Sequence, residues 1–496
     1  MLSFIFHFFM RYFISIFVSL FLFVSCMEDE DYTLSPNDLL TFSTDTVAFD
    51  TIISGAATQT YRFSVHNYAS KAIRITHVDL ERGKDSPFVV NVDGIPLVDG
   101  SASDFEIASQ DSMIVYLMAN LPDKDADEPI LEEDKLSFYT EAGMKQEVIL
   151  TASGQSVTPV KGLRITSDTV FNLKRPYQIL DSLVVEKGAV LTLNPGVRLF
   201  FHAGVNLIVR GTLNIQGTLE APVVLRGDRL GNMFDGQPYD RIPGQWGGVV
   251  FSTESYGNTI RYADIHSGQF GLRVDSSDVK KEKLLIENSI LHNSTNDALN
   301  IRMSKVSVGN SQITNAGKNC VTIRGGDVSL VHCTIGRFYI FAGGEGVALN
   351  FSNMDGGIRL PLHRLYVANS IVTGYQNDEI MGSRSEKYEA DAFNYSFVNC
   401  LLNTIKPKKD DGTMVNCYWD RTENGITPEV VRDKNFTPNF NTEELSFSFA
   451  LSPKSQAVGN ADLSITQSSY PVDIMGKPRS PKADIGCYQH VMVDEK

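Results

Sequence analysis

Apolar and polar residues alternate with a period of two through much of the chain, in segments of only three to five residues. Residues 190–193 and 207–209 are examples, and glycines at 188, 196, 204, 211, 217 and 227 separate such segments. Alternation of this kind is typical of strands with one buried face. Strands this short are not stable as isolated hairpins, but they bury a continuous interior when coil stacks on coil. The pattern therefore predicts a solenoid that begins near residue 183.

A four-residue pattern supports this prediction: Asn or His, then Ser or Cys, then any residue, then a bulky apolar one. Its first two steps are 22 residues each and the later ones are 37, 30 and 17, as expected if one strand per coil stacks while the loops vary in length. The six copies begin at Asn288, Asn310, His332, Asn369, Asn399 and Asn416. Stacked asparagines of this kind bond to one another and to backbone, which is a structural role.

A second row of apolar positions advances at a similar pace. Val274, Ile301, Ile323 and Leu349 are separated by steps of 27, 22 and 26 residues and are predicted to point inward. Two rows that advance together predict a parallel β-helix over residues 165–440, closed by a C-terminal cap over 441–496.

The segment 40–157 has a different texture, with longer alternating segments such as 61–65, 88–92 and 113–117 separated by turn signals. Several antiparallel strands of this kind pack as two sheets. The sequence therefore predicts an all-β chain in which an immunoglobulin-like β-sandwich precedes the solenoid.

Charge excludes one class of partner. The chain has 496 residues and a net charge of −15, and no basic stripe that would neutralise phosphates, so nucleic acid is not expected as a ligand. An acidic surface favours solubility.

The N-terminus has the composition of a secretory signal peptide. Arg11 precedes an apolar run of 13 residues that ends before Cys26, and this run is too short to span a bilayer comfortably. Leu22 and Ser25 before Cys26 resemble the lipobox of bacterial lipoproteins, which implies removal of residues 1–25, lipidation of Cys26 and a membrane partner through the lipid. A translation start at Met10 is an alternative to one at Met1. An uncleaved signal anchor is the alternative to a cleaved signal peptide. The acidic run after Cys26, within a tether over 26–39, resembles a Bacteroidetes surface-export signal; a plain solvated tether is its alternative.

The other cysteines form neither a disulfide framework nor a zinc site. Cys320, Cys333, Cys400, Cys417 and Cys487 are odd in number and contain no CxxC pair. Three of them occupy the second position of the four-residue pattern and are predicted to stack as small buried side chains. A Cys400–Cys417 disulfide between neighbouring coils is the less favoured alternative.

The solenoid resembles right-handed parallel β-helix proteins of the pectate-lyase-like superfamily. The resemblance rests on the coils above, on the segment 245–249 (Gln-Trp-Gly-Gly-Val), and on a C-terminal run shared with bacterial β-helix surface proteins: Leu451-Ser452-Pro453, Asp473, Gly476, Pro478, Arg479 and the segment 483–488. Cys487 departs from the small apolar residue usual at its position. The whole chain resembles surface lipoproteins of Bacteroidetes.

The candidate ligand-binding residues are arginines that flank the inward row. Arg302 and Arg324 are predicted to stack about 4.8 Å apart, and like charges this close favour an anionic group between them. Arginine binds carboxylate or sulfate in a planar fork, which predicts an anionic-glycan groove with Arg273 beside it. The favoured alternative is neutralisation of the arginines by Asp275, Asp297 and Asp327.

Two further candidates remain open. Trp246 is a further candidate ligand-binding residue: together with Phe234 and Tyr239 of the glycine-rich loop before it, it forms either an aromatic platform for a sugar or, as the favoured alternative, part of a flap over the solenoid. A lyase of the resembled superfamily needs a cationic or calcium clamp and a base, and hydrolases of the fold use several close aspartates. No acid cluster repeats at coil spacing. A loose set of polar residues could be assembled into a site: Asp264, His266, Arg273, Asp275, Arg302 and Lys305. His266, His292 and His332 are, however, interpreted as turn or ladder residues.

The sequence as a whole predicts a lipid-anchored outer-membrane protein, exposed on the cell surface, that binds a glycan or another envelope protein. No catalytic residue, cofactor or metal ligand is assigned. A polysaccharide lyase or other glycan-active enzyme is the first alternative, and a structural scaffold is the second.

Overall fold

The computed structural model describes residues 31–234, 236–341, 344–408, 411–420, 428–437, 441 and 445–490. The predicted signal peptide and Cys26 lie outside these residues. The chain forms two compact units, the first mainly from residues up to 154 and the second mainly from residues 155 onward. Within the described part, no helix has the length and apolarity needed to cross a membrane.

The first unit is a β-sandwich of two antiparallel five-stranded sheets. Alternate residues such as Val65, Val115 and Ile75 are fully buried between the sheets, as the alternation predicts. One sheet has the order β1 (Thr41–Phe42), β3 (Tyr61–His66), β8 (Ser112–Ala119), β5 (Phe88–Val92), β6 (Ile95–Pro96). The other has the order β2 (Thr46–Ile53), β10 (Lys145–Gln155), β9 (Ile130–Thr140), β4 (Ile73–Leu80), β7 (Ser101–Ile107).

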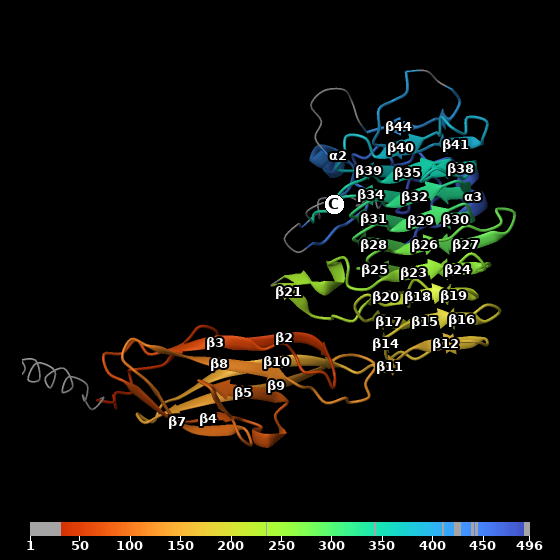
Figure 1. Cartoon of the computed structure of the whole chain (residues 1–496). Coiled ribbons are helices and arrows are strands. Elements are labelled where there is room, and N and C mark those ends of the chain that lie inside the picture. The colour runs from red at the N-terminus through yellow and green to blue at the C-terminus, as the bar shows by residue number, and fades with distance from the viewer. Residues whose placement is uncertain are drawn as a thin grey trace, which may run out of the picture. The chain divides into compact units, whose positions relative to one another are not determined.

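The second unit is a parallel β-helix, so the predicted all-β class, a sandwich followed by a parallel solenoid, is confirmed. Three parallel sheets line it, and Figure 1 shows their strands stacked in chain order from β11 and β12 to β44. The sheet that carries the predicted arginines, called here the arginine sheet, contains β12 (Leu163–Ile165), β15 (Leu183–Val185), β18 (Asn206–Val209), β23 (Gly248–Phe251), β26 (Leu272–Val274), β29 (Leu299–Arg302), β32 (Val321–Arg324), β35 (Leu349–Ser352) and β40 (Ile380–Ser383).

The other two sheets complete each coil. The histidine sheet contains β11 (Thr158–Val160), β14 (Tyr177–Ile179), β17 (Arg198–Phe201), β20 (Val223–Gly227), β25 (Ala263–His266), β28 (Ile290–Ser294), β31 (Gln312–Ala316), β34 (Thr334–Arg337), β39 (Ile371–Gly374), β42 (Leu401–Leu402) and β44 (Tyr418–Trp419). The third sheet contains β13 (Thr169–Phe171), β16 (Val190–Leu193), β19 (Thr212–Gln216), β24 (Asn258–Arg261), β27 (Glu282–Glu287), β30 (Lys305–Gly309), β33 (Gly326–Val331), β38 (Leu362–Ala368), β41 (Phe393–Val398) and β43 (Met414–Val415).

A continuous apolar interior holds the coils together. In the arginine sheet the inward positions follow one another in register through Leu207, Val249, Leu272, Leu299 and Val321, and all five are fully buried. Each such side chain contributes about 1.5–3 kcal/mol when it leaves water. The buried side chains of each coil therefore pack against those of the coils above and below, so no single coil has a core of its own.

The four-residue pattern forms the turn between the third sheet and the histidine sheet. Its first residues all adopt left-handed backbone, with φ from 47° to 52°, a conformation that asparagine tolerates. Asn310 Nδ2 donates to Asn288 Oδ1 at 2.7 Å, and the Ser311 hydroxyl donates to the Gly309 carbonyl while accepting from the Ser289 amide. The predicted structural ladder is confirmed. The five cysteines of the described residues are free thiols.

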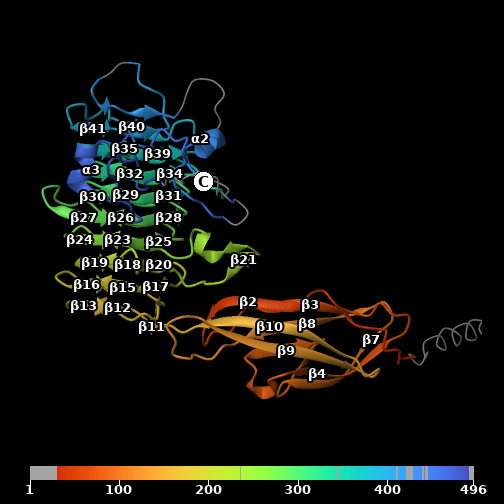
Figure 2. The same ribbon diagram turned by 180° about the vertical axis from the view of Figure 1, so that it is seen from behind.

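Residues 445–490, called here the return segment, run back along the side of the solenoid beside this turn. Phe449, Leu451 and Ile485 pack in one cluster with Ile371 and Leu401 of the coils. Its helix α3 (Leu463–Ser469) lies beside β30 in Figure 1 and in the reverse view of Figure 2. The region predicted as a terminal cap thus covers the flank of several coils. A second helix, α2 (Pro428–Asn435), precedes it.

Candidate functional site

Arg302 and Arg324 stand next to each other on the outer face of the arginine sheet, as the sequence predicts. The two residues are in register on β29 and β32, and their neighbours Ile301 and Ile323 are fully buried. Because successive side chains of a strand point to opposite faces, both guanidinium groups point outward. The row of Arg273, Asn300 and Thr322 is also in register.

The register of the fourth coil corrects the prediction. Leu349 pairs with Val321, and Phe351 takes the place beside Ile323. Asn350 therefore lies in the row of Thr322, and Ser352 lies beside Arg324. The shift is two residues, so Leu349 remains inward. The step from Ile323 to its partner Phe351 is 28 residues, two more than the 26 taken from the sequence, because the length of the connections within a coil carries no information on strand register.

Different carboxylates from those expected lie near the arginines. Arg302 Nε donates to Asp355 Oδ2 at 3.1 Å, and Asp355 belongs to the hairpin β36 (Met354–Asp355) and β37 (Ile358–Arg359). Of the three acids predicted to neutralise Arg302 and Arg324, Asp275 lies 3.6 Å from Arg273. Asp297 accepts from two asparagines and Asp327 pairs with Arg364. The neutralisation hypothesis therefore holds for Arg302, through another acid.

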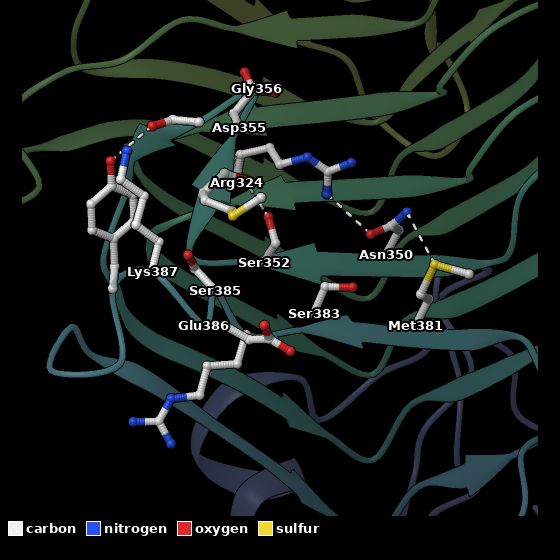
Figure 3. Close-up of a pocket in the computed structure, with 14 residues that line it drawn as sticks. Arg324, Asn350, Ser352, Asp355, Gly356, Met381, Ser383, Ser385, Glu386 and Lys387 are labelled. Atoms are coloured by element: carbon white, nitrogen blue, oxygen red, sulfur yellow. Dashed lines mark hydrogen bonds between the residues drawn. The ribbon is translucent and has the colours of Figure 1, made fainter.

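Arg324 has no carboxylate within 4 Å among the described residues, and its Nη1 donates to Asn350 Oδ1 at 3.0 Å. It lies in the wall of an open pocket of about 760 Å³. Figure 3 shows Arg324 and Asn350 on the strands, with Ser385 to Lys387 across the pocket. Three cationic side chains line this pocket, those of Arg324, Arg384 and Lys387. Its two acidic side chains are those of Glu386 and Asp355, and Asp355 is already paired with Arg302.

Trp246 does not belong to this surface, which corrects its assignment as a ligand-binding residue. Its side chain is fully buried, stacks on Phe201 with 4.4 Å between ring centres, and donates from Nε1 to the His266 carbonyl at 2.7 Å. A large aromatic ring with its N–H satisfied is a core residue. Phe234, in the hairpin β21 (Asn232–Phe234) and β22 (Gln237–Pro238), is exposed, while Tyr239 is half-buried under Arg229.

A cluster that the sequence analysis dismissed lies on the histidine sheet. His266 and His292 are in register on β25 and β28, and their rings stack with 4.8 Å between centres. Asp264 Oδ1 lies 3.0 Å from His266 Nδ1 and 3.1 Å from His292 Nε2. A signal was present: Asp264 and His266 occupy alternate outward positions of one strand, and His292 follows 26 residues later, one coil further on.

A second layer of charge surrounds this cluster. His266 Nε2 lies 2.9 Å from Asp240 Oδ1, and Arg226 pairs with the same carboxylate at 2.5 Å. Burial lowers the pKa of His266, but Asp264 and Asp240 outweigh burial and raise that pKa to about 9. Burial raises the pKa of Asp264, yet the two histidines hold it well below its usual range.

The cluster opens on a second pocket of about 270 Å³. Asp264 and His292 form one wall of it, and the return segment forms another through residues 445–449 and Tyr488. Tyr488 donates to Gln312 Oε1 at 2.7 Å. The pocket therefore combines a carboxylate, an imidazole and amide groups in a space of a few water molecules.

His332, the third histidine of the sequence analysis, has the predicted ladder role. It is fully buried, with Nδ1 3.2 Å from the Gly486 carbonyl and Nε2 2.9 Å from Thr466 Oγ1. Burial and then the charge of Arg479 lower its pKa to about 3. It is therefore neutral at every ordinary pH.

Comparison with known proteins gives partial likenesses. No family profile matches the chain. Over 122 residues, 23% of the chain, it is 32% identical to Protein bark beetle of Drosophila melanogaster, and it spans only 4% of that protein's length.

Three solved structures that are similar to parts of this chain share little sequence identity with it. The gp54 tailspike of Acinetobacter baumannii bacteriophage AP22, in complex with A. baumannii capsular saccharide, is 12% identical over 77% of this chain and 57% of its own, with a TM-score of 0.23. The family 28 exopolygalacturonase of Yersinia enterocolitica is 8% identical over 73% and 92%, with a TM-score of 0.15. A protein of unknown function from Porphyromonas gingivalis W83 is 8% identical over 26% and 50%, with a TM-score of 0.18. These scores add nothing to the strand pairing described above.

Proposed function

We propose that this protein is a lipid-anchored protein of the outer membrane whose β-helix binds an anionic glycan along the arginine sheet without catalysing a reaction. The observation that carries the proposal is Arg324, a half-exposed guanidinium in the wall of the 760 Å³ pocket whose hydrogen bond there is to an amide. Arg384 and Lys387 add positive charge around the same pocket, on a chain whose net charge is −15.

The chemistry of the pocket matches an acidic sugar. A guanidinium presents two parallel N–H donors to a carboxylate or sulfate group, and such charge-assisted bonds are shorter and stronger than neutral ones. The polar side chains of Ser352, Ser383 and Asn350 in the same wall supply partners for sugar hydroxyls. The pocket is open, so a chain longer than one sugar is able to pass through it.

The outer face of the sheet extends this site along the solenoid. Arg273, Asn300, Thr322 and Asn350 follow one another in register on successive coils with a repeat of about 4.8 Å. Thr322 is buried, so the accessible polar groups of this strip are Arg273, Asn300 and Asn350. Arg273 lies over the Phe270 ring at 5.7 Å. A strip of regular polar groups favours an extended ligand, and a polysaccharide is the partner of that shape and polarity. The lipid anchor rests on Cys26 and the residues before it, which resemble a lipobox.

Affinity electrophoresis of the soluble chain in gels that contain polygalacturonate, a sulfated glycan or neutral dextran tests the binding site. We expect retention by an acidic glycan and a loss of affinity of about tenfold or more in Arg324→Ala, since a hydrogen bond to a charged group contributes roughly 1.5–3 kcal/mol. Arg364→Ala is the matched control, because it removes the same charge from a residue paired with Asp327 on the third sheet. Equal retention of both variants would refute the assignment of this site.

The same incubations distinguish binding from lyase chemistry. A lyase releases an unsaturated product that absorbs in the near ultraviolet, whereas a binding protein retains the glycan and releases none. Membrane fractionation tests the anchor separately. Cys26→Ala should move the protein into the soluble fraction, and its persistence in membranes would contradict lipidation.

A further inference from the structure

The cluster on the histidine sheet has a role that the proposed glycan site does not use. Asp264, His266 and His292 come from β25 and β28, and each offers one ligand atom, all within 4.8 Å of one another. We propose that these three residues bind a divalent transition metal of the zinc class, with an open coordination position that faces the 270 Å³ pocket.

The distances match the ligand set of zinc. Zinc binds imidazole nitrogen and carboxylate oxygen at roughly 2.0–2.2 Å, which places neighbouring ligand atoms of a tetrahedral site roughly 3.3 Å apart. Asp264 Oδ1 lies 3.0 Å from His266 Nδ1 and 3.1 Å from His292 Nε2. A metal would take the place of the protons of these two hydrogen bonds, and the two ligating imidazole nitrogens lie within 4.8 Å of each other. Two histidines and one carboxylate are a ligand set of zinc sites that keep an open position.

The surroundings of His266 fix its orientation as a ligand. A metal on Nδ1 leaves the proton on Nε2, and Nε2 already faces Asp240 Oδ1 at 2.9 Å. A carboxylate on the far nitrogen of a ligating histidine sets the tautomer and raises the basicity of the ligand. Asp240 is in turn held by Arg226. The His266 side chain is 6% exposed, whereas that of His292 is 22% exposed and lines the pocket, so an ion enters from the pocket side.

Charge favours a cation at this point. Once an ion has displaced the protons on its ligating imidazole nitrogens, the remaining charges are those of two carboxylates, Asp264 and Asp240, and one guanidinium, Arg226. A divalent ion brings the local charge from −1 to +1 and leaves the ion able to accept one further oxygen ligand. Asp264 and His292 form the wall of the pocket, so that fourth ligand comes from the pocket.

The pocket itself has an unused polar group. Asn315 lines it and is 4% exposed, and its Oδ1 has no hydrogen-bond partner among the described residues. A buried acceptor without a partner is costly, and native structures satisfy such groups with water or ligand. A metal-bound water or a small oxygen ligand that carries a proton supplies a donor within this pocket.

Zinc binding to the untagged full chain, stripped with EDTA, tests the proposal. Isothermal titration with Zn²⁺ should give one equivalent of high affinity, and Co²⁺ should give the visible absorption of a four-coordinate site. His292→Ala should weaken the binding at least a hundredfold, and Asp240→Asn should weaken it 10- to 100-fold because it removes the orienting carboxylate. His363→Ala, on the exposed part of β38, is the matched control and should bind as the wild type.

Thermal melts of the metal-free variants show whether each is folded, and Asp264→Asn replaces His292→Ala if the latter unfolds. Absence of a one-equivalent site, or equal affinity in His292→Ala and wild type, would overturn the proposal and leave a proton-shared network. The outcome is independent of the glycan site, because retention of glycan by the arginine sheet is measured with and without EDTA.

Discussion

Two flanks of one solenoid are built from the same coils and meet solvent in different ways. The outer face of the arginine sheet is open around the 760 Å³ pocket, and Arg324 is half-exposed there with an asparagine as partner. The asparagine turn is covered by the return segment, where Arg479 is only 1% exposed. An arginine side chain is thus accessible to a ligand on one flank, whereas on the other an arginine is buried in contacts within the protein.

The partners of the two arginines explain the difference. Arg479 donates to the Asp484 and Gly486 carbonyls and to Asn310 Oδ1, at 2.7–3.1 Å. A buried charge must have its donors satisfied, and here neutral oxygens do so without a carboxylate within 4 Å among the described residues. Arg324 remains solvated and needs no such set. Burial therefore fixes the role of a cation more strongly than its place in a repeat.

The largest effect on stability should separate these two arginines. Arg479→Ala removes a buried side chain and leaves its acceptors unsatisfied, so we expect the free energy of unfolding of the solenoid to fall by about 3–5 kcal/mol. Arg324→Ala should change it by about 0.5 kcal/mol or less, as is usual for surface positions. Urea titrations of both variants provide the measurement. A similar loss in the two would show that the return segment contributes little.

A second, smaller effect concerns acid. His332 is held neutral by burial and Arg479, with a folded pKa of about 3, whereas an unfolded histidine titrates near 6.5. Its contribution to stability is therefore present above pH 6.5 and is lost as the pH falls toward 3, at up to about 1.4 kcal/mol per pH unit. His332→Asn removes this group and provides the residue that occupies the other ladder positions.

The measurement is the free energy of unfolding at several pH values between 7 and 3. His332→Asn should match the wild type at pH 7 to within about 1 kcal/mol and lose less stability in acid, because asparagine tolerates the left-handed backbone. His363→Asn, on the exposed part of β38, is the control and should keep the wild-type profile. An unchanged acid profile in His332→Asn would mean that the covered flank is open to protons.

The sequence predicted the parts of this molecule that repeat. The inward apolar row and the asparagine row each recur once per coil, and period and register follow directly from stacking. It did not predict Asp355 as the partner of Arg302, because that acid lies on a hairpin inserted between coils, where no period exists. For the same reason the return segment was predicted as a cap at the end of the solenoid, whereas it covers the flank of several coils.

Three site residues were misjudged for a different reason. Trp246 was placed at the surface because glycines and prolines surround it in the sequence. It lies just before β23, however, and its side chain is buried against Phe201. His266 and His292 were judged one at a time as ladder residues. The pairing of β25 with β28 brings their outward positions together beside Asp264, as the spacing of one coil between the two histidines indicates when they are considered as a pair.

The smallest effect concerns the reactivity of the cysteine thiols. Burial raises the pKa of Cys320 and of Cys487 to about 12, which suppresses their reactive thiolate forms. Cys417, at the last described coil, is half-buried, and a hydrogen bond with Cys400 lowers its pKa. Among the five described cysteines we therefore expect iodoacetamide at pH 8 to modify Cys417 first, by peptide mass mapping. Cys417→Ser should remove this fast phase. Equally fast modification of Cys487, which lies in the return segment, would show that the segment detaches from the coils in the native protein.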